Sequence, residues 1–295
     1  MARRPVRGLA ALLIGVTVAA CADATVETST AHTLTTTSTT SKTSTTTAPV
    51  PSTTLPPTTV PALQDIDAEV VVPEGEGPFP AAVLVHGGGW VTGAPGLMDP
   101  LADHLNENGF LTVNTRYELA NFEHPGYPSA VEDVACAVRY AALHPDGDGR
   151  VTVIGHSAGA HLGALVALTG DDYVGECPYP GTGVPERFVG LAGPYDVTRL
   201  GLAIAAFFGG GPDRSPEVWA AGNPQLLTDE NPDLRSLIMY GELDGIVPES
   251  FAIDFNAALM ASGSDSVLEL IEGARHNEMH DPALVGDLIV TWLQG

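Results

Sequence analysis

The chain has 295 residues with 36 acidic and 12 basic side chains, a formal net charge of −24 at pH 7, and 44% of its residues are hydrophobic. This length predicts one globular domain with additional segments. All basic residues are arginines except Lys42, so the chain beyond it lacks the lysine of P-loops, protein kinases and pyridoxal phosphate enzymes. The negative charge also argues against nucleic acid and anionic lipid headgroups as partners.

The first twenty residues have the pattern of an export signal. Three arginines precede an apolar run over 9–20, which is shorter than the ~20 residues that a membrane-spanning helix needs. The end of this run, Val18-Ala-Ala-Cys21, resembles a bacterial lipoprotein lipobox, in which the cysteine is acylated and becomes the mature N-terminus. We therefore expect a cell-surface lipoprotein whose only membrane contact is a lipid anchor on Cys21. The alternative is a secreted protein with an incidental cysteine.

A Ser/Thr/Pro-rich segment follows over 21–61. Residues 22–61 contain 22 Ser or Thr and five Pro and almost no large apolar side chain. They cannot bury enough surface to offset the entropy of ordering, so we expect a disordered stalk that acts as a spacer. The remaining residues, 62–295, carry 34 acidic and 8 basic side chains, a net charge of −26. This segment is the predicted catalytic domain.

Within this domain, short β-branched runs alternate with longer helical patterns. Their alternation predicts an α/β fold with a mainly parallel sheet and helices on both faces, and in this architecture ligands bind at the carboxyl ends of the strands. The predicted strands are 69–72, 81–85, 111–115, 151–154, 188–191, 237–240 and 267–271, and the predicted helices are 98–108, 129–143, 158–169, 249–262 and 283–294.

Two glycine-containing motifs follow predicted strands. Gly155-His-Ser157-Ala-Gly159 lies between a strand and a helix, which is the position that a strained nucleophile turn requires. The alternative is a plain turn in which the serine caps the helix. His86-Gly-Gly-Gly-Trp90 follows the strand over 81–85, and consecutive glycines can direct backbone N–H groups at a developing oxyanion. In a parallel sheet the two motifs can complete one site.

Together, HGGGW and GHSAG resemble the motifs of proteins with the α/β-hydrolase fold. The resemblance is specifically to carboxylesterases related to hormone-sensitive lipase and to the feruloyl/acetyl esterase and kynurenine formamidase groups. The resemblance covers the chain from about residue 66 to the C-terminus. It implies a Ser-Asp-His triad in that chain order, an oxyanion hole formed by the N–H groups of Gly88, Gly89 and Ala158, and neither a metal nor an organic cofactor.

The expected acid and base follow the last two predicted strands. Asp244 matches the family pattern G-x-x-D-x-x-V-P after the strand over 237–240, and Glu242 is its competitor. His276 follows the last strand and is the expected base. His280 lies four residues further on, a spacing that could also suggest metal ligands, but the H-E-x-x-H order is absent. We expect His280 to be an ordinary surface or helix-start residue.

Three further features complete the interpretation. Cys136 and Cys177 can pair in an exported chain, with buried free thiols as the alternative. Asp146-Gly-Asp148-Gly is interpreted as a turn before the serine-bearing strand, because a calcium loop would need a further carboxylate. Residues 62–85 leave no room for the N-terminal helical cap of hormone-sensitive-lipase relatives, so we expect residues 193–235 to form a modest lid with a few apolar contacts.

The expected function is that of a serine esterase that hydrolyses small or short-chain carboxylic esters through an acyl-enzyme. An amidase or formamidase acting through the same triad is the alternative among enzymes, since such a site also cleaves activated amides. A non-catalytic binding domain is a third reading, but the serine, the histidine and the glycine run are all present.

Overall fold

The computed structural model describes residues 66–121 and 123–295. The predicted signal peptide over 1–20, Cys21 and the predicted stalk over 21–61 lie outside the described residues. None of the helices in the described ranges is long and apolar enough to cross a bilayer.

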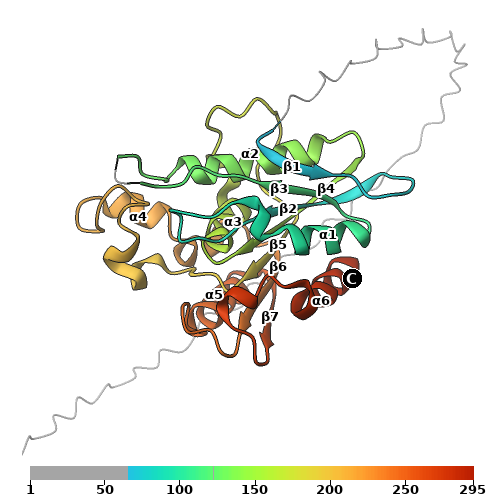
Figure 1. The fold of residues 1–295 in the computed structure, drawn as a ribbon. Coiled ribbons are helices and arrows are strands. Elements are labelled where there is room, and N and C mark those ends of the chain that lie inside the picture. The colour runs from blue at the N-terminus through green and yellow to red at the C-terminus, as the bar shows by residue number, and fades with distance from the viewer. Residues whose placement is uncertain (1–65, 122) are drawn as a thin grey trace, which may run out of the picture. The chain divides into compact units, whose positions relative to one another are not determined.

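Seven strands form one sheet in the order β1-β3-β2-β4-β5-β6-β7. The first strand pairs with β3 in antiparallel orientation, and all other neighbours pair in parallel, so the predicted mainly parallel α/β fold is confirmed (Figure 1). The strands are β1 (Ala68–Val71), β2 (Phe79–Val85), β3 (Leu111–Thr115), β4 (Gly147–His156), β5 (Arg187–Leu191), β6 (Arg235–Gly241) and β7 (Asp265–Ile271).

The helices connect the strands and cover the sheet. The α-helices are α1 (Asp99–Glu107), α2 (Ser129–Leu143), α3 (Ala158–Thr169), α4 (Pro216–Ala221), α5 (Ser250–Ser262) and α6 (Pro282–Gln294). Short 3-10 helices lie between them: η1 (Pro95–Leu97), η2 (Gly170–Asp172), η3 (Val197–Ile204), η4 (Pro224–Leu226), η5 (Thr228–Glu230) and η6 (His276–Glu278).

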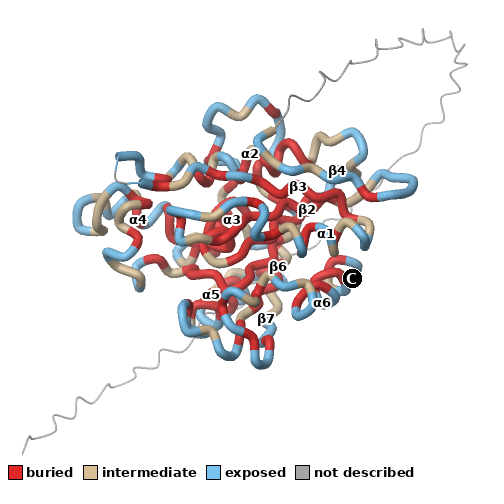
Figure 2. The backbone as a smooth tube through the Cα atoms, viewed as in Figure 1, coloured by how far each residue is buried: buried red, intermediate tan, exposed pale blue. Residues whose placement is uncertain are grey.

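The core consists of two layers, one on each face of the sheet. Strand β2 shows the division, because Val83 and Val85 pack in the layer with α2, α3 and α5, whereas Leu84 packs in the layer with α1 and α6. Successive side chains of a strand point to opposite faces, so a strand covered on both sides is apolar throughout. Figure 2 shows the buried backbone concentrated along these central strands.

The serine-bearing strand begins earlier than the sequence pattern indicates. Strand β4 starts at Gly147, which pairs with Phe79 across a bulge, and not at Val151. Asp148 therefore lies within the strand, where its carboxylate accepts hydrogen bonds from the Arg150 guanidinium at 2.6 and 2.9 Å. Cross-strand pairing and this ion pair order a polar segment that has no β-branched pattern of its own.

The segment over 193–235 differs from the expected lid. Its aromatic side chains are buried: Phe207, Phe208 and Trp219 belong to the main core layer. Phe207 packs against Trp90 with ring centroids 5.5 Å apart, and Trp90 donates a hydrogen bond from Nε1 to Nδ1 of His161 at 3.2 Å. These contacts make the segment an integral wall of the fold, which lies around α4 at the left of Figure 1.

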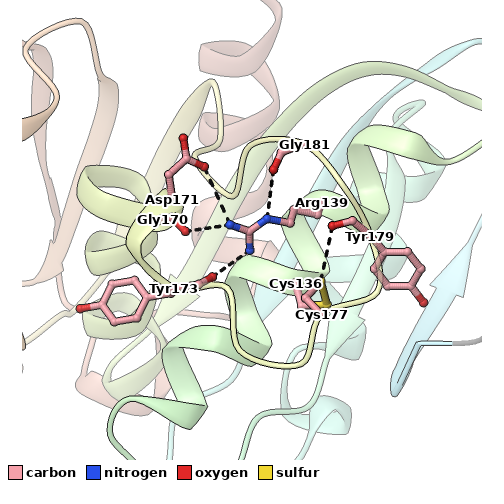
Figure 3. Close-up of a disulfide and its surroundings, with 8 residues drawn as sticks. All are labelled: Cys136, Arg139, Gly170, Asp171, Tyr173, Cys177, Tyr179 and Gly181. Atoms are coloured by element: carbon pink, nitrogen blue, oxygen red, sulfur yellow. Dashed lines mark hydrogen bonds and ion pairs between the residues drawn. A yellow bond between two sulfur atoms is a disulfide. The ribbon is translucent and has the colours of Figure 1, made fainter.

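A disulfide and a buried arginine hold the loop that follows η2. Cys136 on α2 is bonded to Cys177, and the Arg139 guanidinium, one helical turn away, donates to the carbonyl oxygens of Tyr173 and Gly170 at 2.8 and 3.2 Å (Figure 3). The same guanidinium also donates to the carbonyl oxygen of Gly181 at 3.1 Å. The disulfide and these hydrogen bonds connect the loop to α2 at several points.

Candidate active site

The strand register brings the two glycine motifs together. Val85, the last residue of β2, lies opposite Gly155 of β4, so the two turns leave the sheet at the same level. The chain leaves β2 toward β3 on one side and leaves β4 toward β5 on the other. Ligands of open α/β sheets bind in the crevice at such a switch in strand order.

Ser157 sits on a strained turn between β4 and α3. Its φ of 53° and ψ of −118° lie outside the regions that ordinary residues favour. The flanking glycines permit the turn: a Cβ on Gly155 would lie 2.3 Å from the carbonyl oxygen of Gly159, and one on Gly159 would lie 2.1 Å from that of Val85. The G-x-S-x-G spacing is therefore a packing requirement of this turn.

Ser157, His276 and Asp244 form a continuous hydrogen-bonded chain. Nε2 of His276 lies 2.8 Å from Oγ of Ser157, and Nδ1 lies 2.7 Å from Oδ2 of Asp244. The histidine and aspartate side chains are 7% and 2% exposed. In the neutral imidazole, Nδ1 donates to the carboxylate while Nε2 accepts from the serine hydroxyl.

The Asp244 carboxylate is fixed by its own turn. Its Oδ1 accepts the backbone N–H groups of Ile246 and Val247 at 2.8 and 2.9 Å. The competing residue, Glu242, points elsewhere, because its Oε2 accepts the N–H of Gly273 at 2.9 Å. Of the two carboxylates that the sequence left open, Asp244 is the one that contacts His276.

His156 connects the serine turn to the histidine loop. Its Nε2 donates to the backbone carbonyl oxygen of His276 at 2.9 Å, across 120 residues of sequence. Burial, with the nearby His276 adding to it, lowers the pKa of His156 from 6.5 to about 3, so this imidazole stays neutral and keeps its donor at the carbonyl. Sequence reasoning assigned His156 no part in the site, and local sequence carries no signal for this long-range bond.

The glycine run lines the same crevice. Gly88 has a φ of +127°, and a Cβ there would lie 2.0 Å from the carbonyl oxygen of Thr92. Gly89 has a φ of +60° with open space around it, so its backbone can approach a ligand closely. Ala158 is the first residue of α3, where N–H groups lack acceptors within the helix and favour negative charge. Gly88 and Gly89 thus line the cleft together with Ser157, and Ala158 directly follows Ser157 in the chain.

An open cleft of about 570 Å³ leads to Ser157, a volume in the range of small-molecule sites. Most of its walls are apolar, and several come from the segment over 193–235 and from the turn after Asp244. The sequence pattern does not single out these wall residues, because each is an ordinary apolar side chain in a loop or a short 3-10 helix. They are Leu97, Pro194, Leu200, Ile204, Ile246 and Val247.

The expectation for His280 needs correction. Its ring is half-buried, lines the cleft and meets the ring of His156 edge-on with centroids 4.8 Å apart. Burial lowers its pKa. The helix begins two residues later, at Pro282, so His280 belongs to the turn that carries His276 into the site. Among residues 66–121 and 123–295, no group of three His, Cys, Asp or Glu side chains could hold a metal ion.

The strand order, the serine turn after β4 and the hydrogen-bonded Ser-His-Asp chain define an α/β-hydrolase fold. The chain belongs to the BD-FAE family, whose model matches residues 69–259.

Relatives and solved structures agree with this placement. The chain is 31% identical to Esterase LipC of Mycobacterium tuberculosis over 229 residues, which cover 71% of this chain and 56% of LipC. It is 34% identical to Esterase LipI of the same organism over 187 residues, covering 57% of this chain and 58% of LipI. The chain thus spans somewhat more than half the length of these curated relatives.

Two solved structures share the fold at low identity. A truncated carbohydrate esterase from gut microbiota superposes with a TM-score of 0.65 at 19% identity, over 76% of this chain and 89% of that one. Esterase 2 of Thermogutta terrifontis with bound propionate superposes with a TM-score of 0.61 at 19% identity, over 77% and 86%.

Proposed function

We propose that this protein is a serine esterase that hydrolyses small, short-chain carboxylic esters through an acyl-enzyme. The observation that carries the proposal is the chain of short hydrogen bonds from Ser157 through His276 to Asp244 at the floor of an apolar cleft. The esterase names of its relatives support the same reaction class.

Acylation begins with Ser157. Its Oγ attacks the ester carbonyl carbon while the hydroxyl proton passes to Nε2 of His276, and Asp244 stabilises the resulting imidazolium. The carbonyl oxygen becomes an oxyanion that accepts hydrogen bonds from the N–H groups of Gly88, Gly89 and Ala158. When this tetrahedral intermediate collapses, the bond to the alcohol oxygen breaks, and that oxygen takes the proton from Nε2.

Deacylation repeats the sequence with water. A water molecule attacks the acyl carbon on Ser157 and transfers a proton to Nε2 of His276, and a second oxyanion forms in the same position. Its collapse breaks the bond to Oγ, which recovers the proton from Nε2, and the carboxylic acid leaves. Oxidation states do not change, and water is the only co-reactant.

The cleft walls favour short acyl chains. Trp90 and Ile204 line the cleft and are both largely buried, and Phe207 packs against Trp90. We infer that this packed wall limits the length of the acyl chain that the cleft can accept. A long acyl chain would gain ~0.8 kcal/mol for each methylene only where an extended apolar groove could bury it. The related fold of Thermogutta terrifontis esterase 2 has been solved with propionate and with butyrate.

The decisive experiment measures ester turnover by the wild type and by Ser157→Ala. The variant should lose turnover while circular dichroism and thermal unfolding stay unchanged, because the substitution removes the nucleophile and keeps the packing. Activity within tenfold of the wild type would refute the acyl-enzyme. A series of p-nitrophenyl esters should show kcat/KM highest from acetyl to butyryl, and a maximum at twelve carbons or more would contradict the size argument.

The same series discriminates the alternative functions. A matched acetanilide tests the amidase or formamidase, which would hydrolyse the anilide at a rate comparable to the ester. A non-catalytic binding domain would turn over neither substrate.

We also propose that the protein is a cell-surface lipoprotein anchored through Cys21. The proposal rests on the lipobox-like sequence before Cys21 and on the Ser/Thr/Pro-rich residues that follow it. Cys21→Ser should move the protein from the membrane fraction to a soluble or unprocessed form. Wild-type protein found mainly in the culture medium would instead indicate simple secretion.

A further inference from the structure

The described residues that line the cleft are almost all uncharged. Its lining in the described part of the chain contains neither Asp, Glu, Lys nor Arg, and its titratable members are His156, His276 and His280. Burial lowers the pKa of both His156 and His280, so these two imidazoles are neutral at neutral pH. A charged substrate would therefore find no fixed counter-charge in the walls.

The arginines of the domain are engaged elsewhere. Eight arginines fall within residues 66–121 and 123–295, none of them lines the cleft, and seven lie within ion-pair distance of a carboxylate. Arg116, for example, pairs with Asp67 at 3.1 Å, and Arg199 pairs with Asp254 at 3.0 Å. An anionic group that entered the cleft would lose its hydration without gaining a cationic partner, which is strongly unfavourable.

The charge of the whole domain acts in the same direction. Residues 62–295 carry a net charge of −26, and the summed charge of a protein creates a potential over its whole surface, the mouth of the cleft included. The field repels anions and attracts cations before any contact is made. Because this contribution is long-range, added salt weakens it.

We propose that the cleft selects substrates by charge: it accepts uncharged esters, and among charged esters it admits cationic ones far better than those that carry a negative charge on either the acyl or the alcohol part. The proposal rests on the esterase function proposed above. It goes beyond that function by naming a substrate class that the site rejects.

Three acetate esters of similar size test the selectivity: 3,3-dimethylbutyl acetate, its trimethylammonium isostere, and the anionic 2-sulfoethyl acetate. Acid release by the full chain is followed in a pH-stat at about 0.01 M and at about 0.15 M salt, where the Debye length falls from about 30 Å to about 8 Å. At low salt, kcat/KM for the neutral and cationic esters should exceed that for the anionic ester by about tenfold or more. The cation-to-anion ratio should shrink severalfold at the higher salt.

A pair of variants separates the wall from the global charge. Ile246 lines the cleft and is 63% exposed, so Ile246→Arg places a cation at the mouth without disturbing the core. Leu226 is equally exposed but lies outside the lining, so Leu226→Arg makes the same change in net charge away from the cleft. The first variant should raise the anionic-to-neutral ratio of kcat/KM severalfold, and the second should change it by less than twofold.

The outcomes separate this inference from the proposed function. Turnover of the neutral ester tests the esterase, and the ratios among the three esters test the selectivity. Equal kcat/KM for the anionic and cationic esters at low salt would overturn the charge selection while leaving the esterase intact. Equal responses of the two arginine variants would overturn the role assigned to the cleft wall.

Discussion

The buried His156 should contribute an identifiable share of the protein's sensitivity to acid. Burial lowers its pKa from 6.5 to about 3 in the folded state. The unfolded chain therefore takes up a proton on this side chain as the pH falls below 6.5, whereas the folded protein does not. Above pH 6.5 this difference in proton uptake costs the folded state nothing. As the pH falls toward 3, it progressively lowers the free energy of unfolding.

The size of the loss follows from this difference in pKa. Between about pH 7.5 and about pH 5, the difference in proton uptake by His156 lowers the free energy of unfolding by about 2 kcal/mol. The value depends mainly on the unfolded pKa, because the folded group stays neutral over this whole range. The replacement His156→Gln keeps an amide donor in reach of the His276 carbonyl but cannot be protonated.

Urea unfolding of the full chain at both pH values measures the effect. Wild type and variant will share the acid loss that comes from other groups, so the informative quantity is the difference between their losses. We expect His156→Gln to lose about 2 kcal/mol less than the wild type between the two pH values. The matched control, His124→Gln, replaces an exposed histidine and should lose as much as the wild type. An equal loss in the wild type and in His156→Gln would refute the reasoning.

Three further predictions concern the disulfide and the catalytic groups. Replacing Cys136 and Cys177 by Ser opens a loop with a sequence separation of 41. The loss of loop entropy should lower the free energy of unfolding by about 4 kcal/mol, and an unchanged thermal unfolding midpoint would contradict this prediction. Asp244→Asn should lower kcat by roughly 10⁴-fold at neutral pH, because the amide favours the wrong imidazole tautomer, and steady-state kinetics that show a loss below tenfold would remove Asp244 from the triad. His276→Ala should lower kcat about as much as loss of the serine nucleophile does. His280→Ala should change mainly KM, because His280 lines the cleft and lies outside the hydrogen-bonded chain. The reverse ranking in the same kinetics would mean that the base is misassigned.

The sequence by itself was sufficient to predict the existence of the seven strands and of the turn that carries Ser157. Both depend on local properties: β-branched apolar runs favour strands, and glycines flanking the serine permit a turn that any Cβ would block. The order of the three catalytic candidates along the chain came from the motif resemblance, and the structure places His276 within hydrogen-bond distance of both Ser157 and Asp244.

Other features depend on which distant segments meet, and local sequence contains no information about that. The start of β4 at Gly147 is fixed by its partner strand, and the donor that His156 offers to the His276 carbonyl spans 120 residues. The sequence predicts a modest lid over 193–235, yet Phe207 and Trp219 are buried. Burial of these side chains is a property of the surfaces that they pack against, so only the tertiary structure could decide that the segment is a wall of the cleft.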